Sequence, residues 1–249
     1  MKNFVLFAAL LLCLSNCKND SKLDGAQAGK PASHVVKNDD PDFPASEGYI
    51  YIKGLMRKTG NAFGLLQAPN RNMYEILDST HTLEARFLEA VGPLNYDAEA
   101  VYVEVTGKPG EATARTGQKF ILSKIDKIET KNIQNLSSLE FPFDFWCYGP
   151  DWELQITSFE GGVYYINKGE QIAWRGNWKR PTFDGNTYSF DIPEIEGIGG
   201  AMKIVIKKED VVDPVTGVKY SNSVEITANG NTHKGWAVRG FGQFPVLEK

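Results

Sequence analysis

The sequence has few of the residue types from which metal sites and catalytic centres are built. It contains three cysteines and three histidines, which are scattered along the chain (Cys13, Cys17, Cys147, His34, His81 and His233). A metal site needs several such side chains at ligand spacing, and a hydrolytic triad needs a histidine with a credible nucleophile. Phosphate-binding loops and cofactor fingerprints are also missing. The sequence therefore predicts no metal, no cofactor and no enzyme activity.

The chain also lacks an excess of positive charge. Its 27 Lys and Arg residues stand against 31 Asp and Glu residues, which gives a formal net charge of −4. A nucleic-acid-binding surface needs clustered basic side chains that displace counterions from phosphates, and the sequence contains no such stripe. We therefore expect no nucleic acid among the partners.

Hydrophobic runs are short, and the most apolar one lies at the N-terminus. Residues 4–14 are almost wholly apolar, follow a positively charged start and precede Ser15, Asn16 and Cys17. About a dozen residues are too few to span a bilayer core as a helix, so this run is typical of an export signal. Two interpretations are open: an ordinary secretory signal with an incidental cysteine, or a lipoprotein signal, which we favour.

Residues 14–17, with the sequence Leu-Ser-Asn-Cys, resemble the lipobox of bacterial lipoproteins, although Asn16 replaces the usual Gly or Ala. The resemblance implies a signal peptide of residues 1–16 and a Cys17 that carries lipid, palmitate included. Two or three acyl chains hold a protein firmly on a membrane. Lys18 after the cysteine fits the sorting pattern for the outer membrane. We therefore expect a lipid-anchored protein of the cell envelope, periplasmic or surface-exposed.

Residues 17–45 are rich in Lys, Asp, Asn, Gly, Pro and Ala and hold few large apolar side chains. Such a composition cannot bury enough surface to offset the entropy lost on ordering, so it predicts a flexible tether. Once Cys13 is removed with the signal and Cys17 carries lipid, Cys147 has no partner for a disulfide. We expect Cys147 to be a small buried side chain and not a reactive thiol.

Residues 46–137 predict a first domain of five strands and one helix. Strand composition covers five stretches, residues 49–56, 62–66, 73–77, 100–105 and 120–125. Residues 83–91 carry an apolar stripe at helical spacing, with Ser79 or Thr80 as the expected N-cap. Three strands, a helix and two strands is the order of an OB-like Greek-key barrel.

Parts of this first domain, residues 54–55, 74–77 and 100–107, resemble the OB domain of NlpE-type envelope lipoproteins. The resemblance implies an OB-like barrel in an envelope protein. The Cys-x-x-Cys motif that links that family to copper is missing, so copper binding is not implied. The fold alone indicates no ligand.

Residues 138–249 predict a second domain made of strands. About eight short segments alternate between apolar and polar residues and are separated by Gly, Asn, Asp and Pro. Each apolar face needs a partner, and closure removes exposed sheet edges, so we expect an antiparallel eight-stranded small barrel. The predicted fold class of the whole chain is mainly β.

Residues 145–156 and 213–237 resemble the beginning and the end of an envelope β-barrel domain related to the membrane-bound C-type lysozyme inhibitors and the META/HslJ barrels. The two cysteines of that domain are absent here. The inhibitors insert a Ser-Gly-x-x-Tyr loop into lysozyme, which implies a partner-binding loop of Thr216, Gly217, Lys219 and Tyr220. The alternative interpretation, which we favour, is a turn that joins two strands.

We expect a non-catalytic binding or sensing module for another component of the envelope. One alternative is a lysozyme inhibitor that acts through residues 216–220. The third reading is a glycan-processing enzyme, for which Asp144, Asp151 and Glu153 are the candidates for the two members of an acid pair. Carboxylates beside aromatic strands are more often outward-facing polar side chains, which places the enzyme last.

Overall fold

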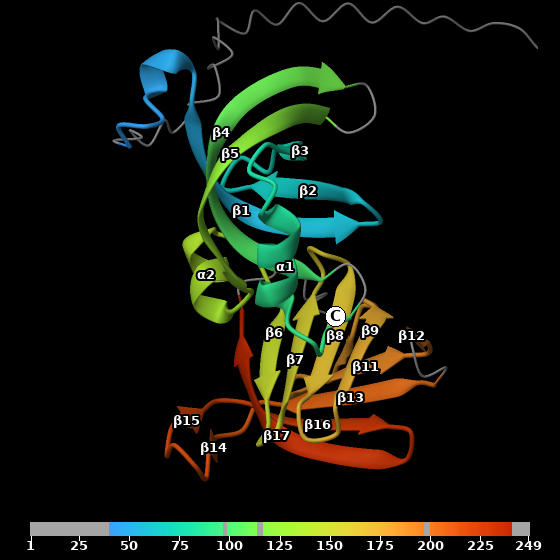
Figure 1. Cartoon of the computed structure of the whole chain (residues 1–249). Helices are drawn as coiled ribbons and strands as arrows, with labels where there is room; N and C mark the ends of the chain where they lie inside the picture. Colours follow the sequence, from blue (N-terminus) through green and yellow to red (C-terminus); the bar gives the residue numbers. More distant parts are fainter. Residues whose placement is uncertain (1–39, 97–98, 114–116, 197–199, 241–249) are drawn as a thin grey trace, which may run out of the picture. The chain divides into compact units, whose positions relative to one another are not determined.

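The computed structural model describes residues 40–96, 99–113, 117–196 and 200–240, which form two large β-sheets, a small two-stranded sheet and few helices (Figure 1). These residues belong to one compact unit. Cys17 and most of the predicted tether lie outside the described residues. The predicted fold class, mainly β, is confirmed. In the described ranges, no helix is long and apolar enough to cross a membrane.

The first sheet is a closed barrel of five strands in the order β1-β2-β3-β5-β4. Its elements are the 3-10 helix η1 (Ala45–Glu47) and the strands β1 (Ile50–Thr59), β2 (Ala62–Gln67), β3 (Met73–Asp78), β4 (Ala100–Thr113) and β5 (Gly117–Thr130). Strands β3 and β5 run parallel, and the other neighbours run antiparallel. The predicted order of three strands, a helix and two strands is confirmed.

Apolar side chains from every strand fill this barrel, because alternate residues of a strand point to the same face. Ile52, Leu65, Val103 and Phe120 are among the fully buried ones. The barrel wall closes tightly at Gly54, where a Cβ atom would lie 2.1 Å from a backbone oxygen of β2. Only glycine fits at such a close approach of two strands.

Helix α1 (Leu83–Val91) lies between β3 and β4 and buries Leu83 and Phe87 against the barrel. Its position agrees with the predicted helix, but the N-cap does not. The cap residue is Thr82, and the carboxylate of Asp78 does the capping by accepting hydrogen bonds from the amides of Thr80 and Leu83 (2.8 and 3.1 Å). Because His81 has a positive φ of 58°, the chain turns back and brings Asp78 to the first helical turn.

The second sheet is curled and has ten strands in the order β10-β11-β13-β16-β17-β6-β7-β8-β9-β12. Its eight longer strands are β6 (Phe145–Tyr148), β7 (Trp152–Thr157), β8 (Gly162–Asn167), β9 (Ile172–Asn177), β11 (Thr187–Ile192), β13 (Met202–Lys207), β16 (Ser223–Ala228) and β17 (Asn231–Arg239). The two-residue strands β10 (Thr182–Phe183) and β12 (Ile195–Glu196) are added at the edges. Since β12 directly follows β11 and pairs with β9, the chain itself joins the two sides of the curl.

The inner face of this sheet forms a separate apolar core. Phe145, Leu154, Tyr165 and Ile204 are fully buried there. Cys147 is buried in the same core, as predicted, and burial raises the pKa of its thiol well above the ordinary value.

A third apolar cluster includes residues from both sheets and from α2 (Ile133–Ser138), which lies between them in the chain. Leu55 and Tyr102 belong to the first sheet, Trp146 to the second, and Leu136 to the helix. A small two-stranded sheet, β14 (Val211–Val212) and β15 (Lys219–Tyr220), completes the described elements.

Candidate functional site

A pocket of about 520 Å³ lies where the outer face of β6, β7 and β8 meets the loop after α1 and the segment after β5. Small-molecule sites in proteins have volumes of roughly 300–1,000 Å³. The pocket is therefore large enough for a small organic ligand.

The floor of the pocket comes from a cross-strand row in the second sheet. In the strand register, Gln155 of β7 lies opposite Trp146 of β6 on one side and Tyr164 of β8 on the other. All three residues line the pocket. Their neighbours along each strand point to the inner face and pack into the core, so the row is held by rigid backbone on a packed sheet.

The wall of the pocket comes from two segments that precede the second sheet in the chain. Tyr96 and Glu99 lie between α1 and β4, and Lys131 directly follows β5. The ring of Tyr96 stacks on that of Tyr164, with 4.6 Å between the ring centres and 17° between the planes. This aromatic contact fixes the wall against the floor.

A buried ion network stands beside the pocket. The ammonium group of Lys131 lies 3.2 Å from the carboxylate of Glu160, and Arg57 of β1 donates to the same carboxylate. The side chains of Lys131 and Glu160 are only 3% and 5% exposed. Burial lowers the pKa of Lys131, and Glu160 opposes that shift. Burial alone would raise the pKa of Glu160, but the two cations outweigh it and the pKa lies below its usual value.

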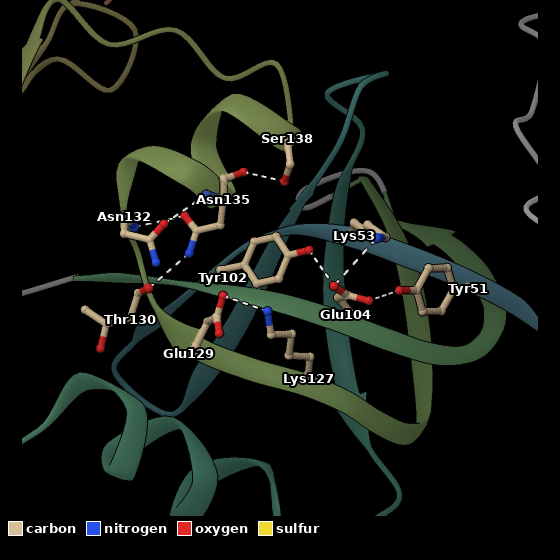
Figure 2. A network of polar contacts seen from close by, with 10 residues as sticks. All are labelled: Tyr51, Lys53, Tyr102, Glu104, Lys127, Glu129, Thr130, Asn132, Asn135 and Ser138. Atoms are coloured by element: carbon tan, nitrogen blue, oxygen red, sulfur yellow. Dashed lines mark hydrogen bonds and ion pairs between the residues drawn. The ribbon is translucent and has the colours of Figure 1, made fainter. Parts of the chain in front are cut away.

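The segment that carries Lys131 is fixed by hydrogen bonds on both sides (Figure 2). Asn132 and Asn135 cap α2 reciprocally, each side chain accepting from the other residue's backbone amide at 2.9 Å. The side-chain amide of Asn135 also donates to the carbonyl oxygen of Thr130 at 3.0 Å. Lys131 is thus held between the end of β5 and the start of α2.

Figure 2 also shows a polar network on the barrel around Glu104. Tyr51 and Tyr102 each donate to one of its two carboxylate oxygens, and Lys53 lies 3.6 Å away. Both oxygens have partners, so this network stabilises β1 against β4.

The pocket differs from that network because two of its polar atoms have no partner. Oε2 of Glu99 and Nε2 of Gln155 are buried and form no hydrogen bond. The two residues are 6% and 4% exposed. A buried polar group without a partner costs about 1–3 kcal/mol, so such atoms in a folded protein indicate a bound ligand or an ordered water.

Two carboxyl groups of the pocket resist ionisation. Burial raises the pKa of Glu99 to about 7, although nearby Lys131 opposes the rise. Burial also raises the pKa of Glu153, which is opposed by a hydrogen bond from the indole of Trp146. The pocket therefore combines aromatic side chains with weakly acidic carboxyl groups.

Neither the protein-family models, nor the curated proteins, nor the solved structures contain a match to this chain. The resemblances to NlpE-type lipoproteins and to lysozyme inhibitors therefore stay predictions from the sequence.

The predicted partner-binding loop lies far along the chain from the pocket residues and forms a tight turn. Thr216 donates its hydroxyl to the carboxylate of Asp213, whose backbone also pairs with Gly217 and Val218 (both 2.9 Å). Gly217 has a positive φ of 72°, which favours glycine. The two remaining loop residues, Lys219 and Tyr220, form β15, and the ring of Tyr220 packs on that of Trp236.

The three carboxylates proposed as an acid pair are not brought together in one site. Asp144 is buried and accepts hydrogen bonds from Ser158 and from the indole of Trp178. Asp151 is exposed and lines a different hollow, whereas Glu153 lines the pocket. Within the described ranges, no group of three His, Cys, Asp or Glu side chains is arranged to hold a metal ion.

The pocket residues Glu99, Lys131 and Gln155 were not predicted from the sequence. Gln155 alternates with apolar neighbours on β7, which is typical of a solvent-facing side chain. The usable signal lies on the adjacent strands. Residues 145–148 and 163–166 have no polar alternation, a pattern typical of strands that are covered on both faces.

Proposed function

We propose that this chain is a membrane-anchored envelope lipoprotein that acts as a non-catalytic binding module, and that the pocket around Glu99 and Gln155 is its binding site. The observation that carries the proposal is the pair of buried polar atoms without partners in one pocket. A folded protein tolerates such atoms where a ligand supplies the missing hydrogen bonds.

The construction of the pocket supports binding. Its polar groups stand on β-strands and on a segment fixed by the α2 cap, and sites on rigid elements hold their groups more exactly than loops do. The Tyr96–Tyr164 stack and the Lys131–Glu160 pair form before any ligand arrives. A preformed site loses less conformational entropy on binding.

In this proposal, the module lies at a membrane because of its N-terminal signal and Cys17. Lipid on Cys17 would anchor the chain in the outer membrane, and the part of the predicted tether that precedes Asp40 would join it to the first sheet, because Asp40 already pairs with Lys124 of β5. A fully extended chain spans up to about 3.5 Å per residue, so such a tether lets the pocket sample the envelope near the membrane. The ligand is then a component of the envelope or of its surroundings.

The proposal is tested by following the Gln155 side-chain amide in an NMR spectrum of the full chain in detergent micelles. The signal is assigned as the one that disappears in Gln155→Met. A library of small uncharged and charged fragments is then added, and we expect some of them to shift this signal. If no fragment shifts it while other side-chain amides respond normally, the pocket is not a binding site.

A lysozyme inhibitor acting through residues 216–220 is the second candidate. The observation in its favour is an exposed, rigid loop tip, with Val215 82% and Val218 48% exposed. Against it, the hydroxyl of Thr216 already donates to Asp213. Inhibition of lysozyme by the purified protein at micromolar concentration, lost in Tyr220→Ala, would support this function; unchanged lysozyme activity would remove it.

A glycan-processing enzyme is favoured by one observation, the presence of Glu99 and Glu153 in the same aromatic pocket. Glycosidases pair an un-ionised acid with an ionised base or nucleophile. Here burial raises the pKa of both groups, so the two carboxyl groups are shifted in the same direction and not in opposite ones. Glycosidase activity that disappears in both Glu99→Gln and Glu153→Gln would overturn the non-catalytic proposal.

A further inference from the structure

The charges around the pocket cancel. Among the lining residues, two carboxyl groups (Glu99 and Glu153) stand against two ammonium groups (Lys131 and Lys168). Behind the wall, the carboxylate of Glu160 binds both Lys131 and Arg57. Transferring a charged ligand into a buried site is costly unless the site supplies an opposite charge. Counted together, three carboxyl groups face three cations, and burial shifts the pKa values of Glu99 and Lys131 toward their neutral forms. The pocket therefore favours an uncharged ligand.

The two vacant hydrogen-bonding positions are of opposite kind. Nε2 of Gln155 is a donor, and Oε2 of Glu99 is an acceptor in the ionised carboxylate. A ligand that satisfies both must accept from one and donate to the other. A hydroxyl group does both at once, and it can also pair with Glu99 when that carboxyl group is protonated.

The remaining lining includes aliphatic side chains (Val91, Leu94 and Ile166) and three aromatic ones. Tyr96, Trp146 and Tyr164 line the same pocket and are each at most 8% exposed. Sugar rings combine these requirements, because their hydroxyl groups donate and accept hydrogen bonds while their C–H faces pack on the apolar side chains of the lining.

We infer that the pocket binds an uncharged saccharide of one or two rings, with ring hydroxyl groups bonded to Gln155 and Glu99. This inference rests on the proposed function, because it names the ligand of the same pocket. The volume of about 520 Å³ suits a ligand of that size.

The test titrates the full chain in detergent micelles with four probes: the neutral disaccharides maltose, cellobiose and chitobiose, and the charged sugar glucuronic acid. Saturation-transfer NMR and calorimetry report binding. We expect at least one neutral disaccharide to bind and glucuronic acid to bind at least tenfold more weakly. Gln155→Met, which keeps the shape but removes the donor, is expected to weaken the neutral sugar about tenfold.

The matched control is Gln118→Met, which changes an exposed glutamine on β5 and is expected to leave sugar binding unchanged. A second variant, Glu99→Met, removes the acceptor and is expected to weaken binding of the neutral sugar about tenfold as well. The folded state of each variant is checked by its thermal unfolding before titration.

Each other outcome overturns the inference. Sugar binding that Gln155→Met leaves unchanged places the sugar elsewhere. Failure of all sugars, with uncharged fragments still shifting the Gln155 amide signal, contradicts the saccharide but leaves the proposed function. If neither sugars nor fragments bind, and a crystal structure shows only an ordered water on Glu99 and Gln155, both the saccharide inference and the proposed function are overturned.

Discussion

Arg57 on β1 of the five-stranded barrel donates to the carboxylate of Glu160, which lies in the turn between β7 and β8 of the second sheet. Lys131 binds the same carboxylate from the end of β5. One carboxylate therefore pairs with two cations from the first half of the structure, and one of these cations, Lys131, is almost completely buried. The contact also backs the wall of the pocket, since Lys131 lines it.

Glu160→Gln is expected to destabilise the protein strongly. The change keeps the size of the side chain but leaves the ammonium group of Lys131 buried without an opposite charge. Removing one partner of a buried ion pair typically costs about 3–5 kcal/mol. Urea unfolding followed by tryptophan fluorescence measures the loss.

The control for this change is Glu225→Gln, which removes an exposed pair with Lys234, 3.5 Å apart. Exposed pairs contribute about 0–1 kcal/mol, so we expect little change in the free energy of unfolding. Equal effects of the two variants would show that the Glu160 contacts carry no special weight.

Glu99 is expected to make stability depend on pH. Its pKa is about 7 in the folded protein against 4.5 ordinarily, so the folded state binds the proton more tightly. The free energy of unfolding therefore falls as the pH rises from about 4.5 to about 7 and stays low above it. The shift corresponds to at most about 3 kcal/mol, because one pKa unit is worth about 1.4 kcal/mol.

Glu99→Gln removes this ionisation, so the free energy of unfolding of the variant rises relative to that of the wild type as the pH rises. We expect similar stabilities at pH 4.5 and a variant more stable by up to about 3 kcal/mol at pH 8. Urea unfolding at five pH values measures the difference. A difference that stays constant with pH contradicts a raised pKa at Glu99.

The alternation of apolar and polar residues predicted the strands of both sheets well. Leu154 and Ile156 point into the core of the second sheet, as a period of two requires. The same pattern failed for Gln155 and Thr157, which it assigns to a solvent-facing side although they are 4% and 0% exposed. Periodicity tells which residues share a face but not what covers the other face.

The pocket itself depends on contacts that no local pattern contains. Arg57 and Glu160 are 103 positions apart in the chain. Tyr96 lies in the loop between α1 and β4, whereas Tyr164 lies on β8 of the second sheet. A charged residue on an exposed strand looks the same in the sequence as one that pairs across two sheets. The fully apolar stretches on β6 and β8 indicate a covered face, but they do not identify the residues that cover it.

The thiol of Cys147 is expected to be unreactive until the protein unfolds. Its side chain is fully buried and burial raises its pKa, so both access and thiolate are lacking. Ellman's reagent added to the Cys13→Ser, Cys17→Ser double variant at pH 8 should release almost no colour in buffer and one equivalent in 6 M guanidinium chloride. A full equivalent released within minutes in buffer would contradict the buried position.

The lipid anchor is expected to depend on Cys17 and not on its neighbour Cys13. The chain is expressed in a diderm bacterium with radiolabelled palmitate, and the membranes are separated by centrifugation. The wild type and Cys13→Ser should carry label and sediment with the membranes, because residue 13 lies within the predicted signal peptide. Cys17→Ser should lose the label and the membrane association, because one thiol receives the diacylglyceryl group and the new amino terminus receives the third chain. Label and sedimentation that persist in Cys17→Ser would show that the N-terminal segment is not a lipoprotein signal.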